Sequence, residues 1–337
     1  MKQSRELIAV GGKLVRAASE RSLQTASAKD WRVVVATFIA SEDVRESSRS
    51  LYTRTLSQFF RWIERTGRNL PELTREDILE YKDSLQEEGL SALTIGSYIV
   101  SVRKFYTWAE AMKIYPNIAR GVKTPKRKND FEKAELTNRQ SSSLLEYCKN
   151  NLSLRDFAIV NLIIRTGLRT IEVVRADIED LTIKTATDET TGEEISQRVL
   201  KIWGKGHDTK DSFVVLSPKA YQPIKDYLSA QRKRANRKEP LFSSDSHRNA
   251  GGRLTTRTIS KLCKDGLTAI GLSGREFTAH SLRHTTGAAI YRQTNNIEEV
   301  QKALRHNSST TSQIYAKRAI AESRIIHAPE LCIDAAF

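Results

Sequence analysis

The segment His280-Ser-Leu-Arg283-His284 gathers side chains that can act on a phosphate group. His280 and Arg283 are three residues apart, so on a helix they share a face and can donate hydrogen bonds to one phosphate. His280 and His284, at i and i+4, also match two zinc ligands, but the Glu of an HExxH pattern is missing and no third ligand follows nearby. The spacing favours phosphate binding over a metal site, with a plain polar surface helix as the alternative.

A second candidate phosphate-binding group lies in the segment Thr166-Gly-Leu-Arg169-Thr-Ile-Glu172. Gly167 permits a tight turn, and Arg169 and Glu172 are again three residues apart. An arginine oriented by a neighbouring carboxylate is prepared to bind a phosphate through two hydrogen bonds. An ion pair on a helix surface, which stabilises little, fits the same spacing.

Lys205 lies between two glycines, in a segment expected to be the turn of a β-hairpin. Glycines on both sides allow the turn to approach a ligand closely. The segment does not match an ATP-binding Walker A loop, because position 199 is Val where Gly is required and position 206 is Gly instead of Ser or Thr.

Tyr315 follows His306 by nine residues, with a run of small hydroxyl residues between them. A tyrosine after a polar loop is, on its own, most often a packing residue. A tyrosine beside arginines and histidines can instead act as a nucleophile toward a phosphodiester.

The composition favours a polyanionic partner for a folded, two-domain protein. The chain has 337 residues, of which 39% are hydrophobic, and 55 Lys and Arg against 40 Asp and Glu give a formal charge of +15. The most apolar run, 157–164, is far shorter than the roughly 20 residues that a bilayer requires, which excludes membrane insertion. Cys148, Cys263 and Cys332 lack metal-like spacing and are predicted to be reduced packing residues in the cytoplasm.

Hydrophobic periodicity divides the chain into two helical regions. Residues 1–27 form a polar, basic extension with weak helical character, and residues 28–120 contain apolar stripes of four helices, one of them opened by Thr74 with an acidic residue, Asp77, three positions later. Residues 121–132 lose this periodicity and read as a basic linker. We expect DNA contacts from basic residues of the last helix and the linker: Arg103, Lys104, Lys123, Lys126, Arg127 and Lys128.

Residues 133–337 are expected to form a second domain, mainly helical with a small antiparallel sheet. The runs 181–185, 199–203 and 212–216 are short and β-branched or alternating, with turn-like segments between them. Helical patterns precede and follow these strands, and a helical tail with an apolar stripe follows Arg318.

Taken in order, Arg169 with Glu172, Lys205 in its turn, His280 with Arg283, His306 and Tyr315 resemble the tyrosine recombinase, or phage integrase, family. The segments TGLRTIE, HSLRHT and LRHNSSTTSQIY match its motif boxes. The four-helix region and basic linker resemble its core-binding domain, so that the likeness covers about residues 28–320. The resemblance implies a two-domain DNA clamp with the tyrosine recombinase catalytic fold and a Xer-like domain arrangement.

This resemblance also implies roles for these residues. Arg169 and Arg283 would hold the oxygens of the scissile phosphate, His280 and His306 would donate further hydrogen bonds, and Tyr315 would be the nucleophile. Lys205 would protonate the leaving 5′ oxygen, and Glu172 would support the site without transferring a proton. The product would be a 3′-phosphotyrosyl linkage, formed with no metal, ATP or other cofactor.

The implied partners are double-stranded DNA carrying specific recombination sites and further copies of the chain. Recombination would run in a homotetramer through a Holliday junction, with room for an accessory DNA-bending or directionality protein. The tail after Arg318 would dock on a neighbouring subunit, or else on its own domain. We expect integration or excision of a mobile element, with Xer-like resolution of chromosome or plasmid dimers as the alternative.

Three other functions compete with this assignment. A type IB topoisomerase uses a similar set of residues, but the separate helical domain and the spacing from His306 to Tyr315 favour recombination. A DNA-binding regulator with the fold but no activity would show decayed catalytic positions, and none is seen. A metal-dependent nuclease would use Asp177, Glu179 and Asp180, a group that is more typical of a turn before the first strand.

Overall fold

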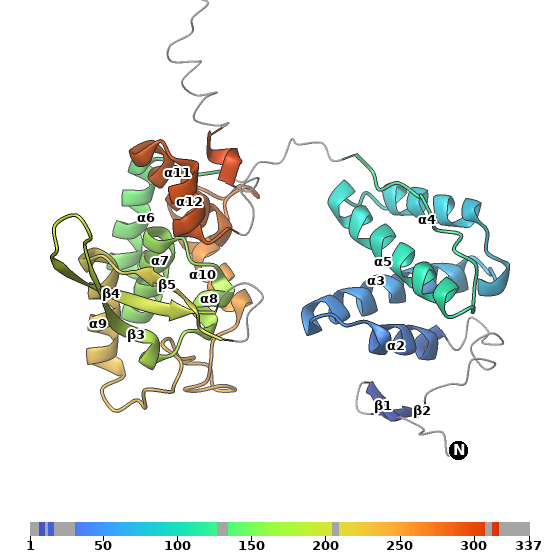
Figure 1. Cartoon of the computed structure of the whole chain (residues 1–337), viewed down its shortest axis with the longest axis horizontal. Coiled ribbons are helices and arrows are strands. Elements are labelled where there is room, and N and C mark those ends of the chain that lie inside the picture. The colour runs from blue at the N-terminus through green and yellow to red at the C-terminus, as the bar shows by residue number, and fades with distance from the viewer. Residues whose placement is uncertain are drawn as a thin grey trace, which may run out of the picture. The chain divides into compact units, whose positions relative to one another are not determined.

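The computed structural model describes residues 31–126, 134–203, 209–306 and 312–316, together with the backbone of residues 7–10 and 13–16 (Figure 1). The chain separates into two compact units, Met1–Asp130 and Phe131–Phe337. This division falls inside the range 121–132 expected for the linker. Within the described ranges, no helix is both long and apolar enough to cross a bilayer.

The first unit is a four-helix domain. Its helices are α2 (Trp31–Ser41), α3 (Glu46–Arg65), α4 (Arg75–Glu87) and α5 (Ala92–Ala111), with a short 3₁₀ helix, η2 (Leu70–Glu72), before α4. Thr74 and Asp77 form the predicted capping box of α4, with the Thr74 amide donating to the Asp77 carboxylate at 2.7 Å. The predicted apolar stripes meet in one aromatic core, where Phe38, Phe60 and Phe105 contact one another edge to face or through neighbouring rings.

The N-terminal extension contains strands, where weak helical character was expected. β1 (Leu7–Val10) pairs antiparallel with β2 (Lys13–Arg16), with Val10 opposite Lys13 in the register. The connection is the sequence Gly11-Gly12, and two-residue glycine connections favour a tight hairpin. This glycine pair was the signal for a hairpin, and the short apolar run alone could not distinguish it from a helix.

The second unit is mainly helical around a small sheet, as predicted. Before the sheet come α6 (Asn138–Asn151), α7 (Leu154–Thr166), α8 (Thr170–Arg175) and the 3₁₀ helix η3 (Ile178–Asp180). After it come α9 (Pro218–Gln231), α10 (Thr256–Ala269), α11 (Ala279–Thr294) and α12 (Ile297–Leu304). The residues 312–316 add one further helical turn that carries Tyr315.

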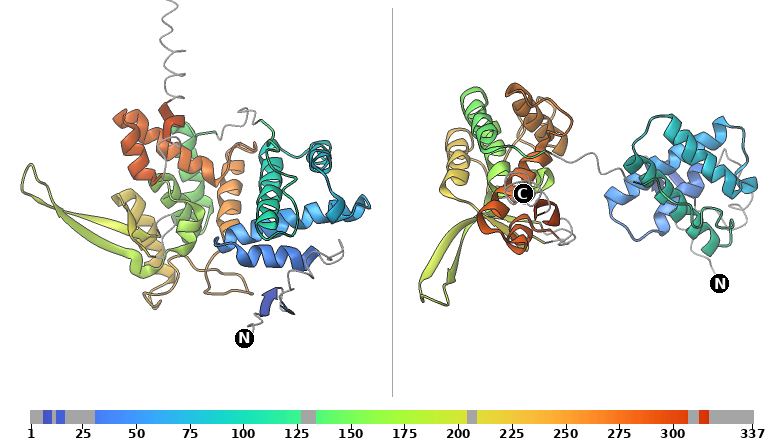
Figure 2. Two further views of the ribbon diagram at one scale, coloured as in Figure 1. Left: turned by 45° about the vertical axis from the view of Figure 1, so that its right-hand side comes forward. Right: turned by 90° about the horizontal axis from the view of Figure 1, so that it is seen from above.

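The sheet has three antiparallel strands in the order β3-β4-β5, at the positions expected from the sequence. The strands are β3 (Leu181–Thr187), β4 (Glu194–Ile202) and β5 (Ser212–Val215), with Leu181 opposite Leu200 and Leu200 opposite Val214. These three residues meet at the base of the sheet, where Leu200 is fully buried. Farther out, β3 and β4 continue as a hairpin that extends away from the helices (Figure 2).

Two hydrophobic clusters stabilise the second unit. The larger one centres on α7, whose burial on nearly all sides explains why it is apolar around most of its circumference. A smaller cluster joins Ala288 of α11, Val300 and Leu304 of α12, and Tyr315. The candidate nucleophile therefore lies in the wall of a small core. Cys148 and Cys263 are buried thiols in the larger cluster, as predicted, and burial raises the pKa of both.

Candidate active site

Arg283 lies at the centre of the candidate site, on α11. Its side chain is almost fully buried, and its guanidinium donates to the main-chain carbonyl oxygens of Gly167 and Leu304. Burial, together with the charge of Arg169, lowers the pKa of Arg283 to about 10, so the side chain still carries its positive charge at neutral pH. Because these two carbonyl oxygens already hold the guanidinium in place, it needs no reorganisation to bind an anion.

Gly167 makes the turn that brings Arg169 to this cation. It ends α7 in the left-handed conformation at φ +62°, and a Cβ on it would clash with the Leu304 side chain. The predicted tight turn is therefore present. It requires glycine because the backbone is left-handed here and because α12 approaches closely. Arg169 follows as the N-cap of α8.

Glu172 orients Arg169 in the way the sequence predicted. Its Oε1 accepts from Arg169 Nη1 at 2.9 Å, and its Oε2 accepts from the Arg169 main-chain amide at 2.6 Å. The Glu172 side chain is only 8% exposed, whereas the Arg169 side chain is 29% exposed. Glu172 is thus the fixed group, and Arg169 presents the accessible positive charge.

Arg305 is a third arginine in this cluster that sequence reasoning missed. Its Nη2 lies 3.3 Å from Glu172 Oε2, so one carboxylate holds two arginines from segments 133 residues apart. Arg305 ends α12 with φ +56°, a left-handed conformation that is unusual for a residue other than glycine, and its Nε is buried without a hydrogen-bond partner. The signal in the sequence was its place directly before His306, but adjacency alone did not indicate the contact with Glu172.

His306 is held beside these arginines as a neutral imidazole. Burial, and then the charges of Arg283, Arg169 and Arg305, lower the pKa of His306 to about 4. Its Nδ1 lies 2.8 Å from the Ser312 hydroxyl, and its main-chain amide donates to the Gln301 carbonyl at 3.0 Å. Ser312 comes from the hydroxyl run before Tyr315, so this run has a contact with the site.

Tyr315 lies against the site in a buried position. The side chain is 5% exposed, its ring is parallel to that of His306 at a centroid distance of 6.5 Å, and its hydroxyl lies 3.1 Å from His284 Nδ1. Burial raises the pKa of Tyr315 to about 12, although the charge of Arg283 opposes that rise. The phenol is therefore protonated at neutral pH in this arrangement.

His280 and His284 form an edge-to-face pair at the start of α11, with ring centroids 4.7 Å apart. His280 is exposed, and its positive charge would lower the pKa of His306, which places it near the cluster. His280 and Arg283 are three residues apart on α11, as expected, and Arg283 is buried in the unit whereas His280 is exposed. His284, considered in the sequence only as a zinc ligand, contacts Tyr315 instead.

The remaining predicted site residues lie in the first unit or outside the described residues. Lys205, Arg127 and Lys128 lie outside the described residues, as does the tail after Arg318. In the first unit, Arg103 and Lys104 are exposed on α5 and line a cavity of about 510 Å³, where Lys104 Nζ lies 3.2 Å from Glu42 Oε2. Lys123 and Lys126 are exposed in the segment that follows this helix.

The acidic group considered for a metal-dependent nuclease is neutralised by cations. Asp177 and Asp180 both accept hydrogen bonds from Lys210, and Asp177 also pairs with Arg253. In the part of the chain that the structure describes, no cluster of His, Cys, Asp or Glu is arranged to hold a metal ion. As the sequence suggested, these aspartates border the 3₁₀ turn before β3.

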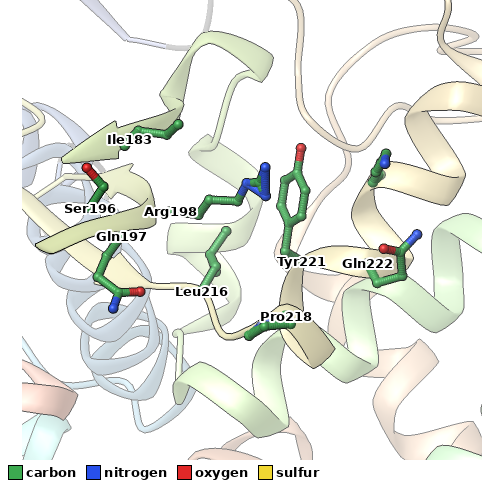
Figure 3. A pocket seen from close by; sticks show the side chains of 9 residues that line it. Ile183, Ser196, Gln197, Arg198, Leu216, Pro218, Tyr221 and Gln222 are labelled. Carbon is green, nitrogen blue, oxygen red and sulfur yellow. The ribbon is translucent and has the colours of Figure 1, made fainter. Parts of the chain in front are cut away.

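A separate cavity of about 340 Å³ lies between the β3–β4 hairpin and α9 (Figure 3). The Arg198 guanidinium stacks on the Tyr221 ring in its wall, 4.5 Å from the ring centroid. Its described lining comprises Ile183, Ser196, Gln197, Arg198, Leu216, Pro218, Tyr221, Gln222 and Lys225. None of the predicted catalytic residues is among them, so this cavity is distinct from the arginine cluster.

The arginine cluster as a whole suits a phosphodiester. Arg169 and Arg283 are permanently charged, planar donors from two different segments, and an aromatic hydroxyl and a neutral imidazole lie beside them. Such a group can neutralise the oxygens of a phosphate and stabilise the extra charge of its transition state.

Comparison with known proteins agrees with this chemistry. The model of the phage integrase family matches residues 134–322, more than half of the chain, and the model of the phage integrase N-terminal SAM-like domain matches residues 35–113. The chain belongs to the phage integrase family of tyrosine recombinases. Enzymes of this family break and rejoin DNA, so the resemblance stated from the motifs is confirmed at the level of family and reaction.

Two similar proteins are tyrosine recombinases of the Xer type. The chain is 27% identical over 278 residues to tyrosine recombinase XerD of Oceanobacillus iheyensis, which covers 80% of this chain and 87% of that protein. It is 30% identical over 221 residues to tyrosine recombinase XerC of Caldanaerobacter subterraneus subsp. tengcongensis, covering 64% of this chain and 57% of that protein. Both relatives are named as tyrosine recombinases.

A solved structure shows the same fold. The XerH site-specific recombinase, in a post-cleavage complex with palindromic difH substrate, matches with a TM-score of 0.67 and 18% identity, over 92% of this chain and 84% of that one. The predicted tyrosine recombinase fold, mainly helical with a small antiparallel sheet, is therefore confirmed.

Proposed function

We propose that this tyrosine recombinase exchanges strands between two specific DNA sites, with Tyr315 as its nucleophile. The observation that carries the proposal is the meeting of Arg169, Arg283 and His306 with Tyr315, from four segments spread over nearly 150 residues of sequence. Chance packing rarely buries an arginine such as Arg283 beside a tyrosine and a histidine, with a second, more exposed arginine nearby. A phosphodiester is the substrate whose charge such a group would complement.

The reaction begins with attack of Tyr315 Oη on the scissile phosphorus. The phenol gives up its proton, for which His280 is the proposed acceptor, as a bond forms between this oxygen and phosphorus. The bond to the 5′ oxygen breaks, and Lys205 gives a proton to the departing 5′ oxygen. The product is a 3′-phosphotyrosine and a free 5′ hydroxyl. The reverse reaction with the 5′ hydroxyl of another strand restores a phosphodiester and the free tyrosine, so strand exchange needs no external energy source.

Tyr315 must leave its buried position before it attacks. Its hydroxyl is bonded to His284 within a hydrophobic cluster, while the accessible charge of the site is on Arg169. A phosphate bound by Arg169 and Arg283 would draw the phenol toward it and lower the pKa that burial has raised, because the adjacent arginines stabilise a phenolate. His280, exposed at the edge of the cluster, is assigned a further hydrogen bond to the phosphate.

The biological role that the relatives support best is Xer-like resolution of DNA dimers. The chain aligns with 87% of the length of an Oceanobacillus iheyensis XerD. Integration or excision of a mobile element uses the same chemistry and is the second candidate, because the Tn1549 transposon integrase shares the fold at a TM-score of 0.62 and 17% identity. Either role places the enzyme in the cytoplasm, on DNA.

The assembly proposed for this reaction is a homotetramer on two DNA sites. A lambda integrase tetramer bound to a Holliday junction shares the fold with a TM-score of 0.60. In the first unit, Arg103, Lys104, Lys123 and Lys126 are exposed and are proposed to contact the DNA backbone, together with Arg127 and Lys128. An accessory DNA-bending or directionality protein would act on this complex.

Covalent capture of DNA tests the proposal. The wild-type chain, incubated with fragmented genomic DNA in EDTA, is expected to form a denaturant-resistant adduct, and Tyr315→Phe is expected to reduce that adduct to background. Tyr291→Phe, at a half-buried tyrosine of α11, is the matched control and should still form it. An adduct that persists in Tyr315→Phe would overturn the assignment of the nucleophile.

Sequencing the captured DNA separates the biological roles. A single chromosomal site supports dimer resolution, and sites at the two ends of one element support integration. Efficient relaxation of supercoiled DNA that lacks any captured site would instead indicate a type IB topoisomerase.

A further inference from the structure

Arg305 lies outside the predicted catalytic set, yet it shares a carboxylate with one member of that set. Glu172 Oε1 accepts from Arg169 Nη1 at 2.9 Å, and Glu172 Oε2 lies 3.3 Å from Arg305 Nη2. The side chains of Glu172 and Arg305 are both largely buried. One carboxylate therefore lies between two guanidinium groups, with little water to screen their charges.

The balance of charges in this cluster depends on Arg305. Arg169, Arg283 and Arg305 are positive at neutral pH, because a guanidinium keeps its proton, and Glu172 is the one carboxylate bonded to them. Three cations against one anion leave a formal charge of +2. His306 adds no charge, because burial and these three arginines lower its pKa to about 4.

The guanidinium of Arg305 is bound within the protein. Nη1 donates to the Ala303 carbonyl oxygen at 2.7 Å, Nη2 donates to Glu172, and Nε is buried without a hydrogen-bond partner. Burial lowers the pKa of Arg305, and the charge of Glu172 opposes that fall. With both terminal nitrogens occupied, Arg305 acts on a bound phosphate through its charge and through Glu172.

The loss of Arg305 would leave Glu172 paired with Arg169 alone. A guanidinium paired with a carboxylate is a dipole, whose field falls off faster with distance than the field of a single charge. Arg169 is the more exposed of the two, so it is the group whose charge a phosphate meets. Arg305 therefore offsets the carboxylate that would otherwise weaken this charge.

The proposed reaction requires this second net positive charge. A phosphodiester carries one negative charge, and attack by the deprotonated Tyr315 adds another to the pentacoordinate phosphorus group. A cluster of charge +2 matches that transition state, whereas a cluster of charge +1 leaves half of it uncompensated. Glu135, whose charge also acts on Tyr315, pairs with Arg292 and does not alter this balance.

We propose that Arg305 is a positioning residue that holds and neutralises Glu172, so that Arg169 presents its full charge to the scissile phosphate. This inference rests on the proposed function, in which the cluster binds the phosphate that Tyr315 attacks. The common element is Glu172, whose two carboxylate oxygens bind the two arginine side chains separately.

A change in the charge of the scissile phosphate tests this proposal. Replacement of one non-bridging oxygen by methyl gives a neutral methylphosphonate, whose transition state carries one negative charge in place of two. Coulomb energy is proportional to each charge, so an effect exerted through charge should halve on a logarithmic scale. The second-order rate constant of adduct formation is measured on both duplexes, with separated methylphosphonate diastereomers, at a site captured with the wild-type enzyme.

We expect Arg305→Gln to slow adduct formation on the ordinary duplex roughly 10- to 100-fold, the effect of one uncompensated charge nearby, and on the methylphosphonate by only about 3- to 10-fold. Arg305→Lys keeps the charge and should remain within about threefold of wild type on both duplexes. Lys302→Gln is the matched control, because it removes an exposed cation of α12 that pairs with Glu299. Its rate constants should equal those of wild type.

Removal of the carboxylate provides an independent measurement. The double variant Glu172→Gln/Arg305→Gln has the same net charge as wild type, so it should form the adduct on the ordinary duplex faster than Arg305→Gln alone. If Arg305 acted only through packing, the two losses would add and the double variant would be the slower one. This comparison decides if the methylphosphonate reacts too slowly to measure.

The outcomes separate this inference from the proposed function. If the wild-type chain forms no adduct that depends on Tyr315, the proposed function itself is wrong. If it does, but Arg305→Gln is slowed equally on both duplexes or not at all, the inference is overturned, and a double variant no faster than Arg305→Gln also overturns it. Should Arg305→Gln fail to fold, Arg305→Gly removes the charge together with the left-handed strain at φ +56°, and the same comparison of the two duplexes decides.

Discussion

The hydroxyl of Tyr315 lies 3.1 Å from Nδ1 of His284, and this bond holds the proposed nucleophile inside a hydrophobic cluster. His284 lies on α11, one residue after Arg283, so the helix that supplies a phosphate-binding arginine also holds the tyrosine at rest. Binding of DNA must therefore compete with this bond. In the free chain Tyr315 is held in a resting position, and it must move before it can attack.

Replacement of His284 by Phe tests this arrangement. Phe keeps a ring of similar size but leaves the buried Tyr315 hydroxyl without its partner, so the free energy of unfolding should fall by about 1–3 kcal/mol. The rate of covalent adduct formation should stay the same or rise, since the resting position is weakened. Urea unfolding and single-turnover cleavage are the measurements.

The Tyr315→Phe background provides the control for this substitution. Without the hydroxyl, His284→Phe should cost little additional stability, because no buried group is left unpaired. A drop in adduct formation of about 100-fold or more in His284→Phe alone would contradict a resting role and assign His284 to proton transfer.

Gly287 gives the ring of Tyr315 its space. A Cβ at this position on α11 would lie 2.5 Å from Tyr315 Cζ and 2.8 Å from Leu304 Cδ1. Gly287→Ala should therefore lower the free energy of unfolding by about 1–3 kcal/mol through overcrowding, although alanine is the better helix former by about 1 kcal/mol. Thermal unfolding gives the comparison.

Two variants establish that Tyr315 causes this cost. Gly96→Ala, inside α5, is the control, since its Cβ would meet Thr124 atoms no closer than 3.8 Å and should stabilise the chain slightly. In a Tyr315→Ala background, Gly287→Ala should lose most of its penalty. If the penalty stays unchanged there, the tyrosine ring is not what fills the space.

Local sequence signals predicted the helices and strands from residue 31 onward and most members of the candidate site, because these signals involve residues close together in the chain. Arg169 with Glu172 is an example, since the pair lies within one turn of α8. Contacts between distant segments were not predictable in this way. The bond from Arg305 to Glu172 crosses 133 residues, and the bond from Tyr315 to His284 depends on how the 312–316 turn packs on α11.

Two substitutions of Arg305 separate the effect of its strained backbone conformation from the effect of its ion pair with Glu172. Both Arg305→Gly and Arg305→Ala remove the bond to Glu172, but only Ala must then adopt the left-handed conformation at φ +56°. The Gly variant should therefore be more stable than the Ala variant by about 1 kcal/mol. Both should cleave DNA more slowly than wild type, because Glu172 loses one of its two arginines. Equal stability of the two variants would show that residue 305 relaxes out of this conformation.

The lowered pKa of His306 predicts how the free energy of unfolding changes with pH. Its pKa is about 4 in the folded chain, lowered by burial and by the charges of Arg283 and Arg169, against 6.5 when unperturbed. The unfolded chain therefore binds the proton first as pH falls, so His306 contributes stability that is present above pH 6.5 and is lost as pH falls toward 4. His306→Gln should show less loss of unfolding free energy between pH 7 and pH 5 than wild type does.

The control for this pH dependence is His247→Gln, at an exposed histidine in the loop after α9. This variant should follow the wild-type pH curve, because the side chain is exposed to water in the folded chain as it is in the unfolded chain. Urea unfolding at several pH values in this window measures all three proteins. Identical curves for wild type and His306→Gln would mean that folding leaves the pKa of His306 unchanged, which would contradict the lowered value described above.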